Sequence, residues 1–119
     1  MTMPSGWAGG NSTVFSSAGE AKAWVNFNGT GTVAIRASFN VSSITDNGTG
    51  DYTVNFKTAM PDVNYAAIGS TQGSGVSVVP IISMNQGNSQ TTTKVNVYLT
   101  GGVGGVTFDY NYVAVAIFR

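Results

Sequence analysis

Short stretches of alternating apolar and polar residues, separated by glycine-rich turns, constrain the fold of this chain most strongly. In residues 21–28 every second side chain is apolar, with Val25 and Phe27 on one face and Trp24 on the opposite, polar face. Residues 51–58 repeat the pattern. A period of two is typical of a half-buried strand, and no window shows apolar residues at helical spacing over three turns. The alternation therefore predicts an all-β chain.

Glycine, asparagine and proline residues indicate where the strands end. Asn28-Gly29 predicts a type I′ hairpin turn, because these two residues tolerate positive φ best, and the chain would return in a strand from 32 to 44. Residues 45–50 predict a second turn. Further strands are expected at 51–58, 63–70, 76–84, 92–100 and 107–119. A chain of about eight short strands favours an antiparallel β-sandwich with a jelly-roll-like arrangement.

Two of the expected strands carry additional information. Pro80 donates no ladder hydrogen bond, so strand 76–84 should lie at an edge or contain a bulge. The last strand is apolar on both faces from Tyr112 onward, so its outer face should be covered by the amino-terminal arm or by another subunit. The predicted core consists of Val25, Phe27, Val33, Ile35, Val54, Phe56, Ile68, Val97, Val115 and Ile117.

The chain divides into an arm and one domain. Residues 1–19 are rich in Gly, Ser and Asn with isolated apolar side chains, which predicts an irregular amino-terminal arm that docks through Trp7 and Phe15. Residues 20–119 form the β-sandwich domain. Neither an internal repeat nor a linker divides this domain.

The composition argues against most catalytic and nucleic-acid functions. Charged residues make up only 8% of the chain, and the five basic and five acidic side chains give a formal net charge of zero, which disfavours nucleic-acid binding. The absence of His and Cys removes the commonest general base, the thiolate nucleophile and the usual zinc ligands. The segment 46–51 clusters oxygen ligands but does not match a calcium loop, so a hairpin turn is favoured. We therefore expect no enzyme, no cofactor and no metal.

The surface must owe its solubility to neutral polar groups. Ser, Thr and Asn together number 37, against ten charged residues, and a neutral surface of this kind is poor at preventing association. No apolar run approaches the roughly 20 residues of a membrane helix, and no signal peptide is visible, so no membrane insertion is expected.

Polar loops are the expected recognition elements. The segments 69–75 and 85–90 are rich in Gly, Ser and Gln and should be exposed. The aromatic side chains could stack on sugar rings, or lie in the core or in a subunit interface. The candidate recognition residues are Thr71, Gln72, Asn85, Gln86, Asn88 and Gln90.

Two segments carry a resemblance to a known family. They are KAWVNFNGTGTVAIRASFNVSSITDNGTGDYTVNF, within 21–70, and the ending YVAVAIFR. With these segments the chain resembles the carboxy-terminal module of tailed-bacteriophage tail fibre proteins. The resemblance implies a β-rich knob that assembles as a homotrimer and binds, or supports binding to, the host cell surface. It implies no catalytic residues.

The resemblance sets the expected partners and place of the protein. We expect contacts with further copies of the chain, with other virion proteins through the arm, and with a host-surface glycan or protein. The expected location is the virion tail. The alternative is a capsid decoration, or cement, protein on the capsid surface of a tailed phage.

Overall fold

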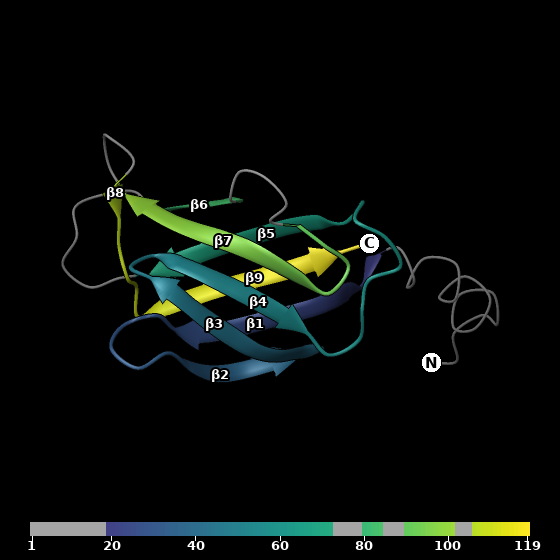
Figure 1. The fold of residues 1–119 in the computed structure, drawn as a ribbon, viewed down its shortest axis with the longest axis horizontal. Coiled ribbons are helices and arrows are strands. Elements are labelled where there is room, and N and C mark those ends of the chain that lie inside the picture. The colour runs from purple at the N-terminus through teal and green to yellow at the C-terminus, as the bar shows by residue number, and fades with distance from the viewer. Residues whose placement is uncertain (1–18, 73–79, 85–89, 102–105) are drawn as a thin grey trace, which may run out of the picture.

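Two antiparallel sheets make up the fold (Figure 1). The computed structural model describes residues 19–72, 80–84, 90–101 and 106–119, and the elements in these ranges are strands. Every neighbouring pair is antiparallel, which confirms the all-β, antiparallel prediction. Sheet A has the order β2 (Ala34–Phe39), β1 (Ala21–Asn28), β9 (Tyr112–Phe118), β5 (Ala66–Gln72). Sheet B has the order β3 (Val41–Gly48), β4 (Asp51–Phe56), β7 (Lys94–Gly101), β6 (Pro80–Met84), and β8 (Val106–Thr107) also pairs with β7.

The core lies between the two sheets and is filled by alternate residues of their central strands. Phe27 of sheet A meets Tyr52 of sheet B edge-on, with ring centroids 5.2 Å apart and an interplanar angle of 71°. Burying one large apolar side chain stabilises the fold by about 1.5–3 kcal/mol. The side chains that are at most 2% exposed include Ala23, Val25, Phe27, Tyr52, Val54, Val95, Val97, Leu99, Val113, Val115 and Ile117.

Most of the predicted core is confirmed. Val33 is partly buried and packs against the core. Ile35 and Ile68 were predicted wrongly, because 38% of Ile35 and 57% of Ile68 is exposed. The predicted residues found in the core are Val25, Phe27, Val54, Phe56, Val97, Val115 and Ile117.

Each of the two errors has a physical cause. Ile35 lies opposite Phe27, but on the edge strand β2, where every residue is exposed. Ile68 lies opposite Ala116, on the outer face of sheet A. Its strand has the opposite phase from the one expected, and a shift of one residue moves every side chain to the other face.

The strand expected from 32 to 44 is in fact two strands in different sheets. The chain leaves sheet A after Phe39 and enters sheet B at Val41, and the residue between them, Asn40, has a left-handed φ of 54°. The Asn40 side chain holds this corner. Its Nδ2 donates to the carbonyl oxygens of Lys22 and Thr58, at 3.0 and 3.1 Å, and its Oδ1 accepts from the Thr58 N–H at 2.7 Å.

The Asn28-Gly29 turn is longer than predicted. β1 ends at Asn28 and β2 begins at Ala34, so the tight two-residue hairpin is wrong, and positive φ occurs at Gly31 instead. Gly29 is needed for a different reason: a Cβ there would lie 2.7 Å from the Tyr52 hydroxyl. The second turn, predicted at 45–50, is shorter than expected: β3 continues to Gly48 and only residues 49–50 form the turn, with positive φ at Gly48 and Gly50.

The single closing strand expected at 107–119 is wrong, because β8 pairs with β7 in sheet B whereas β9 lies in sheet A. β6 pairs with β7 and lies at the edge of sheet B, as Pro80 predicted. In the described ranges no helix is long and apolar enough to cross a membrane. The proposed docking residues Trp7 and Phe15 lie outside the described residues, as do the loop residues Asn85, Gln86 and Asn88.

Candidate functional site

The outer face of sheet A, called the A face below, gathers large apolar side chains. The strand registers align Phe39, Trp24, Ala116 and Ile68 in one row across β2, β1, β9 and β5, and we call this the apolar row. Its three large side chains are 54%, 39% and 57% exposed in the order Phe39, Trp24, Ile68. Single exposed apolar side chains are normal on a protein surface, whereas a contiguous row marks an interaction surface.

A groove follows the central strand β9 on this face. Its floor consists of small residues, Ala114 and Ala116, and its walls include Trp24 on β1 and Ile68 on β5. The groove has a volume of about 450 Å³. The alternation of large and small side chains from strand to strand therefore produces a trough that can receive apolar groups.

A polar pocket adjoins this groove towards the opposite end of the strands. It has a volume of about 260 Å³ and shares Asn26, Ser70 and Ala114 with the groove. Gln72, which lies opposite Tyr112, also lines it. The sequence-predicted residues Thr71 and Gln72 thus come together in one pocket, whose lining is Asn26, Ser70, Thr71, Gln72, Tyr112 and Ala114.

Arg36, which sequence reasoning did not select, does not line this pocket but contacts its lining residue Tyr112. Its guanidinium carbon is 4.0 Å from the centre of the Tyr112 ring, and its Nη1 donates to the Asn111 carbonyl oxygen at 2.5 Å. The pairing of β1 with β2 changes register here, from Asn26 opposite Ala37 to Phe27 opposite Ile35, which leaves Arg36 as the extra residue of a β-bulge. Neither the bulge nor this contact has a local sequence signal.

Gln90, another sequence-predicted recognition residue, is held far from this pocket. Its Nε2 donates to the carbonyl oxygens of Val63 and Tyr65, at 2.7 and 2.9 Å. These residues precede β5, whereas Gln72 is at the end of β5. The structure therefore does not bring Gln90 together with Gln72.

The outer face of sheet B, called the B face, is polar and internally hydrogen-bonded. Asn55 Nδ2 donates to Ser43 Oγ at 3.1 Å and to Thr45 Oγ1 at 3.0 Å. Thr53 Oγ1 donates to Asn96 Oδ1 at 2.8 Å and accepts from Asn47 Nδ2 at 2.9 Å. Hydroxyls and amides on neighbouring strands thus satisfy one another, as cross-strand pairs do.

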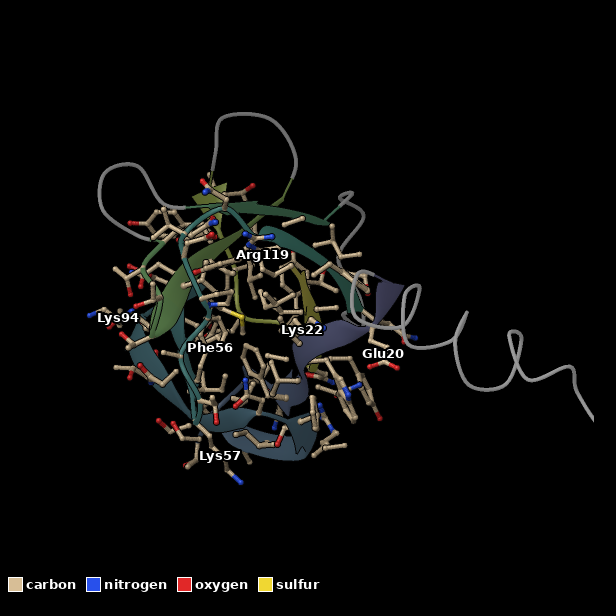
Figure 2. All side chains as sticks on the ribbon, turned by 90° about the vertical axis from the view of Figure 1, so that its right-hand side faces the viewer. Glu20, Lys22, Phe56, Lys57, Lys94 and Arg119 are labelled. Atoms are coloured by element: carbon tan, nitrogen blue, oxygen red, sulfur yellow. The ribbon has the colours of Figure 1, made fainter. Side chains whose placement is uncertain are left out.

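A hollow of about 730 Å³ lies at the end of the molecule that carries Arg119. Figure 2 labels Arg119 and three other charged residues that line the hollow, Glu20, Lys22 and Lys57. Arg119 Nη2 lies 2.7 Å from Asp62 Oδ2. Hydrogen bonds from Arg119 and from the Asn64 backbone lower the pKa of Asp62 to about 2. Even with Arg119 paired to Asp62, Lys22 and Lys57 outnumber Glu20, so the described charges around the hollow are positive in balance.

The other carboxylate with several partners is structural. Asp109 Oδ1 accepts from the Gly50 N–H at 2.8 Å and lies within hydrogen-bonding distance of the Tyr52 hydroxyl. Burial, followed by the hydrogen bond to Asp109, raises the pKa of Tyr52 well above its usual 10.0. This network joins three turns at one end of the fold. In the described part of the chain no group of three or more acidic side chains could hold a metal ion.

The sequence contains the residues that make the A face apolar, but the strand register is needed to show that they lie side by side. Trp24 interrupts a polar face, and β9 places alanines opposite its core-facing valines. Only the pairing shows that Trp24 and Ile68 stand on either side of Ala116. A comparison of this chain with protein-family models, with curated proteins and with solved structures found no match.

Proposed function

We propose that the chain is a structural protein of a bacteriophage virion, a tail fibre or fibre-tip module that contributes to host-cell attachment. In this proposal the domain is a jelly-roll-like sandwich that assembles as a homotrimer through its A face. The observation that carries the proposal is a contrast between the two outer faces. The A face is apolar, whereas the polar side chains of the B face hydrogen-bond to one another. The sequence resemblance to tail fibre modules supplies the biological setting.

The apolar row gives self-association a physical driving force. Phe39, Trp24 and Ile68 together expose a contiguous apolar strip in an isolated chain. Burying such side chains stabilises an interface by about 1.5–3 kcal/mol each, before the cost of association is subtracted. Symmetric closure is the usual way in which copies of one chain cover such a surface, and threefold closure suits a fibre.

Oligomeric state tests the assembly. Light scattering on the wild-type chain at micromolar concentration should give the mass of a trimer. Ile68→Glu should give a monomer, because it places a charge in the apolar row, while circular dichroism shows that the strands persist. The matched control is Thr45→Glu, an exposed position on the B face, which should remain trimeric. A monomeric wild type, or a trimeric Ile68→Glu, would contradict the assembly.

Host adsorption tests the attachment role. The purified trimer should compete with intact phage carrying this chain for adsorption to host cells. Labelling of such particles should place the chain on the tail. Label on the capsid shell, together with a lack of competition, would contradict the tail role and favour a capsid decoration protein.

A further inference from the structure

Along the strand direction, one half of the A face is apolar and the other half is polar; the boundary between them crosses the strands. The next row beyond Phe39, Trp24, Ala116 and Ile68 holds Asn26, Ala114 and Ser70, and beyond it Tyr112 lies opposite Gln72. Successive rows on one face are about 7 Å apart, because residues alternate and each rises about 3.4 Å. The apolar half can therefore be covered by another subunit while the polar pocket at the other end stays open.

We infer that the polar pocket, together with Arg36, which packs over the ring of its lining residue Tyr112, binds the carboxylate of an acidic sugar. This inference deepens the proposed host attachment and rests on it for its biological meaning. Its structural basis is separate, because it uses only the geometry of Arg36, Tyr112 and the pocket lining.

Arg36 is held as an anion-binding group before any ligand arrives. The guanidinium carbon lies 4.0 Å from the centre of the Tyr112 ring, and Nη1 donates a hydrogen bond to the Asn111 carbonyl oxygen, so two contacts hold the side chain in place. Within the described residues no carboxylate pairs with Arg36, whereas Arg119 is paired with Asp62. The guanidinium has five N–H donors, so further donors remain for a carboxylate, which Arg binds in a two-pronged geometry.

The β-bulge explains how an edge-strand residue reaches the pocket. Arg36 is the extra residue between Ala37, opposite Asn26, and Ile35, opposite Phe27. Bulges redirect a side chain, and they are over-represented beside functional sites. Here the redirection carries the guanidinium past β1 to Tyr112 at the start of β9.

The pocket lining fits the rest of a sugar acid. Ser70, Gln72 and Tyr112 offer neutral hydroxyl and amide groups beside the cation. Asn26 Oδ1 is buried and has no hydrogen-bond partner among the described residues. This oxygen is closed off from the pocket, so the polar groups that a ligand can meet there are those of Ser70, Gln72 and Tyr112.

A matched pair of sugars tests the inference on the full chain. Methyl β-D-glucuronide carries a carboxylate where methyl β-D-glucoside carries a hydroxymethyl group. In an NMR titration the glucuronide should shift the Arg36 Nε signal and the Gln72 side-chain amide. The glucoside should bind at least about tenfold more weakly, because it lacks a charge-assisted hydrogen bond. Equal binding of the two sugars would overturn the inference.

Acetate carries a carboxylate but no sugar ring, so its binding shows whether the pocket recognises the sugar or only the negative charge. If acetate binds as tightly as the glucuronide, the pocket lining contributes nothing and the inference fails. Arg36→Gln should weaken glucuronide binding at least about tenfold, and Arg36→Lys should restore only part of it, because lysine keeps the charge without the planar fork. The control is Lys57→Gln, in the hollow at the Arg119 end, which should bind like the wild type. Wild-type binding by Arg36→Gln would also overturn the inference.

Light scattering on the same samples distinguishes the two proposals. Arg36→Gln should remain a trimer, because Arg36 lies outside the apolar row. A wild-type chain that is monomeric but binds the glucuronide would contradict the assembly and support the sugar site. A trimer that binds neither sugar would contradict the sugar site alone.

Discussion

The two outer faces of this domain are built from different kinds of residues: large apolar side chains on the A face, and hydroxyls and amides on the B face. On the B face, Thr53 and Asn55 each bond to side chains on neighbouring strands. On the A face, Trp24 and Ile68 flank the alanines of β9 and have no such partners. The comparison shows that a chain with very few charges can make a hydrophilic face from hydroxyl and amide side chains. We call their hydrogen bonds across neighbouring strands a side-chain ladder. The face left without a ladder is then the one available for contacts.

Removing a side chain from the shared core should affect both faces most strongly. Phe56→Ala deletes a ring that is 7% exposed and meets Tyr65 edge-on at 5.8 Å. We expect a loss of about 3–5 kcal/mol in the free energy of unfolding, the usual range for emptying a buried aromatic site. Urea denaturation measures this loss. A change below about 1 kcal/mol would mean that the two sheets do not pack on Phe56 as described.

Breaking the ladder of the B face should have an intermediate effect. Thr53→Ala removes a hydroxyl that donates to Asn96 and accepts from Asn47, at a position that is 7% exposed. We expect a loss of about 1–3 kcal/mol in urea denaturation, because two polar partners lose a hydrogen bond. The control is Ser42→Ala on β3, whose exposed hydroxyl donates at 3.2 Å to the Asn55 carbonyl oxygen, and it should cost less than about 0.5 kcal/mol. Equal losses in the two variants would show that the ladder does not stabilise the B face.

The smallest effect on stability is expected from the exposed ion pair between Asp62 and Arg119, which belongs to neither face. Arg119→Gln should raise the pKa of Asp62 from about 2 towards its usual 3.8, because the largest stabilising hydrogen bond is lost. A carboxyl whose pKa is lowered by folding stabilises the fold above its unfolded pKa, and this contribution disappears as the pH falls from about 3.8 to about 2. An NMR titration of the Asp62 carboxyl carbon measures the shift. An unchanged pKa in Arg119→Gln would contradict the pairing.

The sequence predicts strands best where alternation is uninterrupted. Residues 21–28 and 51–56 have the expected strands and the expected buried faces, because each strand packs one face on the core along its whole length. The alternation fails at Asn40, where the chain changes sheets between two residues that both look like strand. It also fails at Ile68, because the preceding turn sets the phase of β5 and its length cannot be read from the strand itself.

The candidate site could be predicted only in part for the same reason. Thr71 and Gln72 were selected because the segment 69–75 was expected to be an exposed loop; both line the polar pocket, but they lie within β5, and the Thr71 hydroxyl is buried. Arg36 was missed because its position depends on a bulge, and a bulge is a property of two paired strands rather than of one segment. Pairing between distant strands therefore decides which surface residues meet.

The position of β9 has a consequence for how the protein is made. It is the last of the described strands in the sequence, yet it lies in the interior of sheet A, paired with β1 on one side and β5 on the other. During synthesis β1, β2 and β5 leave the ribosome before the strand that joins them. The floor of the groove, Ala114 and Ala116, is therefore absent from every nascent chain that still lacks β9. In the assembly that we propose, the A face is therefore complete only after translation has passed this strand.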